Sequence, residues 1–139
     1  SAARAAEVRQ RFDQAVVMLH ARQHQHAVTA LHRVLELEPR LPEAHVNMGF
    51  AMIGLGRPAA ARDFFDGAIA LAPEQANAYY GLALAWEGLG DLPMALGAMR
   101  TYLHRARRES DAHRARARAA LWEWEQRVKG PPGAASAAR

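Results

Sequence analysis

Residues 42–75 read PEAHVNMGFAMIGLGRPAAARDFFDGAIALAPEQ, and their pattern returns in residues 76–109. Pro39 and Pro73 mark the same place in successive units. Their spacing, which is one repeat period, also relates five further sets of residues: Ala27, Ala61 and Ala95; Met18, Met52 and Trp86; Ala15, Gly49 and Ala83; Leu31, Phe65 and Met99; Val34, Ala68 and Tyr102. Because six independent sets agree on one period, the chain is built from an internal repeat.

Each repeat unit divides into two helical runs joined by a glycine-rich turn. The turns are Gly54-Leu55-Gly56-Arg57-Pro58 and Gly88-Leu89-Gly90-Asp91, and Pro58 and Pro93 suit the first turn of a following helix. The chain contains 32 alanines but only 11 β-branched residues, which favours helix over strand. The sequence therefore predicts an all-α protein made of helical hairpins.

Small and large apolar residues recur at fixed places within the units. Gly49 or Ala83 on a first helix, facing Ala61 or Ala95 on the second, would allow two helix axes to approach to roughly 8 Å. Bulky residues around this contact, such as Phe65, are expected to pack each hairpin against its neighbour, and each contributes about 1.5 to 3 kcal/mol when buried. Stacking therefore stabilises units that would be marginal alone.

These residues resemble the tetratricopeptide repeat family. The resemblance covers three units, about 8–41, 42–75 and 76–109, and a C-terminal capping helix at about 110–129. It implies a right-handed α-solenoid of three helix-turn-helix repeats in a single domain, 1–129, and we expect residues 130–139 to form a flexible tail. The chain departs from the family pattern early in the first helices, where Arg11 and His45 replace an aromatic residue and only Tyr79 conforms.

The resemblance also implies a curved solenoid whose first helices line a concave face, where family members hold segments of other proteins. We expect the inward residues to be Phe12, Val16 and Leu19, then Val46, Asn47, Phe50 and Ile53, then Asn77, Tyr80, Leu84 and Glu87. The capping helix would close one side with Asp111, Arg114, Arg118 and Trp122. An apolar trough with an arginine rim predicts a hydrophobic or amphipathic segment with acidic flanks as ligand.

Some family members grip the C-terminal carboxylate of heat-shock chaperones with lysine, asparagine and arginine. The corresponding places carry Phe12, Val16, Asn77 and Gly81, and only Asn47 is retained, so such a clamp is not expected. The apolar stripe could instead be covered by the capping helix or by a second copy of the chain. The interpretation as a ligand-binding face competes with that alternative.

Other chemistry finds little support. The absence of cysteine excludes disulfides and thiolate metal sites, the few serines and threonines suggest no nucleophilic constellation, and no cofactor is expected. His20 and His24 are four residues apart, as metal ligands on a helix can be, but a surface turn is the commoner outcome. Gly54-x-Gly56 imitates a dinucleotide fingerprint but joins two helices instead of following a strand.

The main alternative concerns seven arginines against two acidic residues between Arg100 and Arg118, a surface that could contact RNA or an anionic membrane. Another is that the chain is a targeting or oligomerisation module of a larger enzyme. No membrane-spanning stretch or signal peptide is evident, and the sequence begins at Ser1. We predict a non-enzymatic protein-interaction adaptor in a bacterial, envelope-associated assembly, with a cytoplasmic location as the alternative.

Overall fold

The computed structural model describes residues 1–131, which contain helices and turns only. The helices are α1 (Ala2–His20), α2 (His24–Leu37), α3 (Pro42–Gly54), α4 (Pro58–Leu71), α5 (Ala76–Gly88), α6 (Leu92–Arg105) and α7 (Asp111–Lys129). The prediction of an all-α protein is confirmed. Most of the predicted tail, 132–139, lies outside the described residues.

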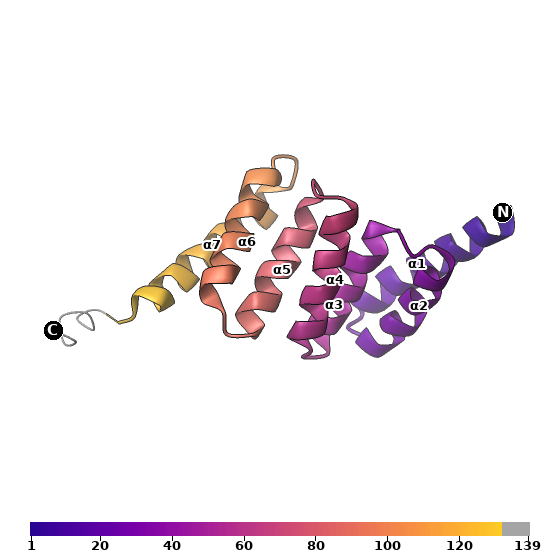
Figure 1. Cartoon of the computed structure of the whole chain (residues 1–139), viewed down its shortest axis with the longest axis horizontal. Helices are drawn as coiled ribbons and strands as arrows, with labels where there is room; N and C mark the ends of the chain where they lie inside the picture. The colour runs from indigo at the N-terminus through magenta and orange to yellow at the C-terminus, as the bar shows by residue number, and fades with distance from the viewer. Residues whose placement is uncertain (132–139) are drawn as a thin grey trace.

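The first six helices form three hairpins that stack side by side, with α7 packed against α6 at one end (Figure 1). The first helices α3 and α5 begin one repeat period apart, at Pro42 and Ala76. The second helices α4 and α6 begin the same distance apart along the chain, at Pro58 and Leu92. The period found in the sequence is therefore the period of the solenoid.

The turn inside each hairpin uses one residue with a positive φ angle. Gly56 and Gly90 adopt φ angles of 71° and 78°, and Arg22 occupies the equivalent place in the first hairpin with a φ of 60°. Glycine tolerates this left-handed conformation, whereas a residue with a Cβ atom is strained there. The first unit therefore keeps the geometry of the turn despite its divergent sequence.

A hydrogen bond ties each later hairpin to the segment that precedes it. His45 Nε2 donates to the carbonyl oxygen of Pro39 at 2.8 Å, and the hydroxyl of Tyr79 donates to that of Pro73 at 2.7 Å. The two bonds are equivalent in the repeat. His45 therefore makes the hydrogen bond that the aromatic residue Tyr79 makes in the next unit.

The largest fully buried side chain among the described residues is the ring of Phe65 on α4. This ring lies against Gly49 on α3 and Gly81 on α5, and a Cβ atom added at Gly49 would stand only 2.6 Å from it. Gly49 was expected to face Ala61, but the nearest group at its surface is this ring. The two glycines therefore make room for one large side chain between neighbouring hairpins.

Candidate functional site

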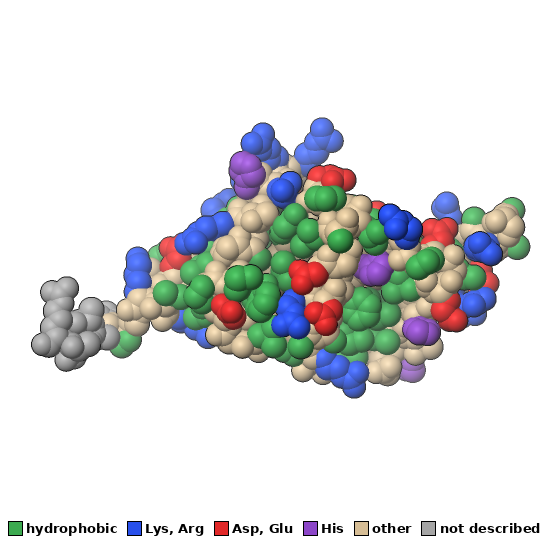
Figure 2. Space-filling view, in the orientation of Figure 1, with side chains coloured by type: hydrophobic (Ala, Val, Ile, Leu, Met, Phe, Trp, Pro, Cys, Tyr) green, Lys and Arg blue, Asp and Glu red, His purple; other side chains and the backbone are tan. Residues whose placement is uncertain are grey.

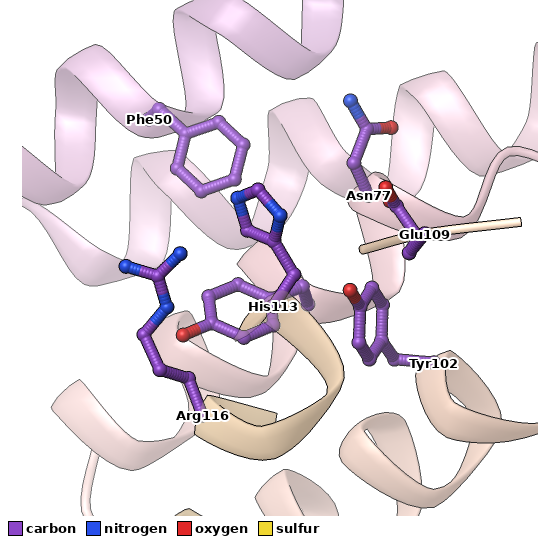
Figure 3. A pocket seen from close by; sticks show the side chains of 7 residues that line it. Phe50, Asn77, Tyr102, Glu109, His113 and Arg116 are labelled. Carbon is purple, nitrogen blue, oxygen red and sulfur yellow. The ribbon is translucent and has the colours of Figure 1, made fainter. Parts of the chain in front are cut away.

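A pocket of about 440 Å³ opens between the first helices and α7. Its lining residues come from four helices and from the connection between α6 and α7: Phe50, Asn77, Tyr80, Tyr102, Glu109, His113 and Arg116 (Figure 3). Phe50, Asn77 and Tyr80 were predicted from the sequence as inward-facing residues, and the structure brings these three together. The pocket therefore lies on the face formed by the first helices.

Aromatic rings form the apolar part of this pocket. The rings of Tyr80 and Tyr102 meet edge to face with centroids 5.2 Å apart, and Phe50 meets the buried Phe65 in the same way at 5.0 Å. Burial, followed by the negative charge of Glu109, raises the pKa of Tyr102 above its ordinary value. Tyr102 lines the pocket, and its hydroxyl can hydrogen-bond to a ligand.

The polar rim of the pocket is supplied by α7 and the start of α5. His113 and Arg116 are exposed and extend from α7 toward the side of the pocket that holds Phe50 (Figure 3). Ser110 caps α7, and its Oγ lies 2.6 Å from His113 Nδ1, which fixes the imidazole at the rim. The rim thus combines a guanidinium, an imidazole and the amide of Asn77 around an aromatic floor.

The remaining predicted groove residues on the first helices occupy different environments. Val46 is only 1% exposed and lies in the core, so its prediction as a ligand-facing residue was wrong. Phe12 lines a second pocket near the N-terminus. The others are half-buried and line neither of these two pockets: Val16, Leu19, Asn47, Ile53, Leu84 and Glu87.

The capping helix presents a different face from the one predicted. The guanidinium of Arg114 donates to the carbonyl oxygen of Ala106 at 2.9 Å, and Arg118 is exposed but does not line the pocket. Trp122 is 65% exposed, whereas Trp124 is 4% exposed and packs in the core. The cause is the helix phase: α7 begins one position later, relative to α5, than the repeat period predicts, and its pocket residues His113 and Arg116 lie two positions beyond the repeat counterparts of Asn77 and Tyr80. His113 and Arg116 therefore occupy the rim, and the repeat period alone did not identify them.

The second pocket, of about 500 Å³, opens where α1 meets the start of α3. It is lined by Ala5, Val8, Arg9, Phe12, Asp13, Glu38, Leu41 and Glu43. Three of these residues are acidic and one is basic. Within residues 1–131, Asp13, Glu38 and Glu43 form no ion pair. The pocket therefore has an apolar floor and a negatively charged rim.

The arginine cluster between Arg100 and Arg118 is divided among several surfaces. Arg100 pairs with Glu125 at 3.3 Å, Arg105 stacks on the ring of Tyr79, and Arg114 is bound to a backbone carbonyl. Basic side chains project at the upper edge of the molecule in Figure 2, where Figure 1 places the connection between α6 and α7. Three of the seven arginines are therefore engaged in contacts within the chain.

The histidine hypothesis also finds no geometric support. His20 Nδ1 donates to the carbonyl oxygen of Val16 at 2.9 Å, and the ring of His24 packs on Gly54. Among the residues that the structure describes, no group of three histidine or carboxylate side chains is arranged to hold a metal ion. None of the described helices is both long and apolar enough to cross a membrane.

Comparison with known proteins rests on structure, because no family model and no curated protein sequence matches the chain. The first TPR domain of Spaghetti (RPAP3), bound to the HSP90 peptide SRMEEVD, superposes with a TM-score of 0.80 at 17% identity. The alignment covers 90% of this chain and 95% of that domain. The chain has the tetratricopeptide repeat fold. Its three hairpins are the three repeats, and α7 is the capping helix.

Two further solved structures, of SycD and PcrH, share this tetratricopeptide repeat architecture. The type III secretion translocator chaperone SycD of Yersinia enterocolitica has a TM-score of 0.82 at 10% identity, over 88% of this chain and 86% of SycD. PcrH, solved with the chaperone binding region of PopD, has a TM-score of 0.77 at 19% identity, over 86% of this chain and 92% of PcrH. At such low identities the likeness shows the fold and leaves ligand recognition to the side chains.

Proposed function

We propose that this protein is a non-enzymatic adaptor that binds a hydrophobic or amphipathic segment of another protein along its first helices. The observation that carries the proposal is the open aromatic pocket around Phe50 and Tyr80. Its volume of about 440 Å³ lies within the range of roughly 300 to 1,000 Å³ typical of ligand pockets. An apolar side chain of the partner would rest on these rings.

The capping helix leaves this pocket open. Helix α7 packs against α6 and contributes to the rim, while Phe50 and Tyr80 remain partly exposed. Self-coverage by the last helix, the alternative considered from the sequence, would have buried both rings. The exposed rings favour an external ligand.

The polar groups around the rings indicate which groups of the ligand lie next to its apolar side chain. Arg116 is exposed and forms no ion pair within residues 1–131, so it can bind an acidic residue of the ligand. The amide of Asn77 has both donors and an acceptor for the backbone of an extended segment. We therefore assign to the ligand an apolar anchor next to a carboxylate.

Two of the structural neighbours were solved with partner segments, an HSP90 peptide in one and the chaperone binding region of PopD in the other. These complexes support segment binding as the use of the fold here. The likeness to SycD supports a role in a bacterial, envelope-associated assembly. The proposal is tested on the pocket itself and does not depend on that setting.

The test compares two phenylalanines that are both half-buried but lie on different helices. Phe50→Glu places a charge in the pocket, whereas Phe64→Glu places one on α4, where Phe64 packs near His45. A pull-down followed by titration of the purified partner segment should show loss of binding for Phe50→Glu and retention for Phe64→Glu. Circular dichroism verifies that both variants stay helical. Equal retention by two folded variants would place the binding surface elsewhere.

A further inference from the structure

The two pockets described above occupy equivalent positions at opposite ends of one face. Arg9 and Phe12 on α1 correspond, after two repeat periods, to Asn77 and Tyr80 on α5. Arg9 and Phe12 line the N-terminal pocket, and Asn77 and Tyr80 line the C-terminal one. The row of first helices therefore has a pocket near each end, and we call this row the groove.

Helix α7 continues this groove once its phase is taken into account. On α5, the residues Ala78, Gly81 and Ala85 are buried. The residues of α7 that follow them by one repeat period plus two positions are Arg114, Ala117 and Leu121, and these are also buried or half-buried. With the same offset, Asn77 and Tyr80 correspond to His113 and Arg116, which line the same pocket. The groove therefore runs from α1 through α3 and α5 to α7.

The two ends of the groove differ in charge. The N-terminal pocket has three carboxylates, from Asp13, Glu38 and Glu43, against the single guanidinium of Arg9. The C-terminal pocket has one carboxylate, Glu109, against the guanidinium of Arg116, with the imidazole of His113 beside them, so it lacks the acidic excess of the N-terminal pocket. Both ends have an apolar floor, so charge is what distinguishes them.

We propose that the groove selects a segment with opposite charges at its two ends. Basic residues of the ligand lie over the pocket of Asp13, Glu38 and Glu43, an apolar centre rests on Phe50, and acidic residues lie against Arg116. This selectivity rests on the proposed function, because it describes the ligand of the same groove. Charge complementarity of this kind determines orientation and excludes wrong partners.

The fold also limits the spacing of the two charges. Neighbouring helices pack roughly 8 to 10 Å apart, and the pockets are about two such steps apart. An extended chain advances about 3.3 Å per residue, so the basic and acidic groups are separated by roughly five or six residues. Segments whose charges are adjacent reach only one end of the groove.

The experiment uses synthetic peptides with a shared six-residue apolar centre and four kinds of flank. One has a lysine pair at one end and a glutamate pair at the other, one has lysine at both ends, one has glutamate at both ends, and one has glutamine at both ends. Each is made in both chain directions, and binding is measured by fluorescence anisotropy. We expect the peptide with opposite charges, in one direction, to bind about threefold to tenfold more tightly than the like-charged peptides. The preference should weaken as salt is raised.

Charge-reversed variants assign the preference to the two pockets. Glu43→Lys should remove the advantage of the lysine flank, and Arg116→Glu that of the glutamate flank. Both residues are exposed, so neither change disturbs the core. Asp63→Lys on α4 and Arg57→Glu in a turn are the matched controls outside the groove, and they should leave the preference unchanged.

The outcomes separate the two proposals. If all four peptides bind equally and Phe50→Glu abolishes that binding, the groove binds segments but the charge selectivity is wrong. If the glutamine-flanked peptide and the charged peptides all fail to bind the folded protein, both proposals are overturned. A preference that survives Glu43→Lys and Arg116→Glu would also overturn the selectivity.

Discussion

The substitution Gly49→Ala tests the packing that holds the groove together. A Cβ atom at Gly49 would stand 2.6 Å from Cε1 and Cζ of Phe65, whereas ordinary van der Waals contact begins near 3.4 Å. The ring cannot retreat freely, because Phe65 is fully buried and Gly81 lies against it as well. The variant must therefore separate α3 from α4 or displace the ring.

The expected cost follows from two opposing effects. Overpacking a well-filled core destabilises a protein by about 1 to 3 kcal/mol. Alanine in place of glycine inside a helix stabilises the folded protein by roughly 0.5 to 1 kcal/mol, because alanine loses less backbone entropy on folding. We expect Gly49→Ala to lower the free energy of unfolding by about 1 to 2 kcal/mol. Gly81→Ala should cost more, because its Cβ atom would overlap the same ring more deeply.

The matched control is Gly97→Ala in α6. Gly97 is also a helical glycine, but it is exposed and a Cβ atom there would meet nothing within 4 Å. This variant should therefore be more stable than the natural protein by about 0.5 to 1 kcal/mol. The comparison uses urea denaturation followed by circular dichroism. If Gly49→Ala matched Gly97→Ala in stability, the argument that Phe65 requires glycine at this position would be wrong.

Further predictions concern the cap, a turn and an ion pair. Trp124→Ala should destabilise the protein by about 3 to 5 kcal/mol, because Trp124 is 4% exposed. Trp122→Ala should cost little, because Trp122 is 65% exposed, and thermal unfolding compares the two variants. Arg22→Gly should raise the free energy of unfolding by about 1 kcal/mol in urea titrations, because the φ of 60° strains a residue with a Cβ atom. The hydrogen bond from Arg33 Nε, 2.8 Å from Glu7 Oε1, lowers the pKa of Glu7 below its ordinary value of 4.5. Its stabilisation is present above that value and is lost as pH falls through the lower folded pKa. Thermal melts of Glu7→Gln and the natural protein should therefore differ at neutral pH and converge in acid.

Much of the fold could be predicted because residues one repeat period apart make equivalent packing contacts between neighbouring helices. Ala44, Met48 and Ala51 on α3 are buried on the side that meets the preceding hairpin. Their counterparts one period earlier are Gln10, Gln14 and Val17, and Val17 is 67% exposed. Helix α1 has no preceding hairpin, so polar residues are tolerated there. The divergence of the first unit therefore has a physical origin at the end of the solenoid.

The groove was harder to predict than the fold, because a helix face is narrow. Val46 and Phe50 are four residues apart and share one side of α3, yet Val46 is 1% exposed while Phe50 lines the pocket. The difference depends on where neighbouring helices cover α3 along its length, which periodicity does not record. Val46 and Phe50 were therefore both assigned to the groove surface, although Val46 belongs to the core.

The capping helix shows how a small change in phase transfers a site from one residue to another. A helix turns about 100° per residue, so the two-residue difference between Arg116 and Arg118 rotates the side chain by roughly 200°. The connection between α6 and α7 has five residues, 106–110, whereas the one between α4 and α5 has four, 72–75, so the longer connection accounts for one of these two positions. Extending the repeat period into α7 therefore selects residues from the wrong side. The groove acquires Arg116 through this change of phase and not through the repeat.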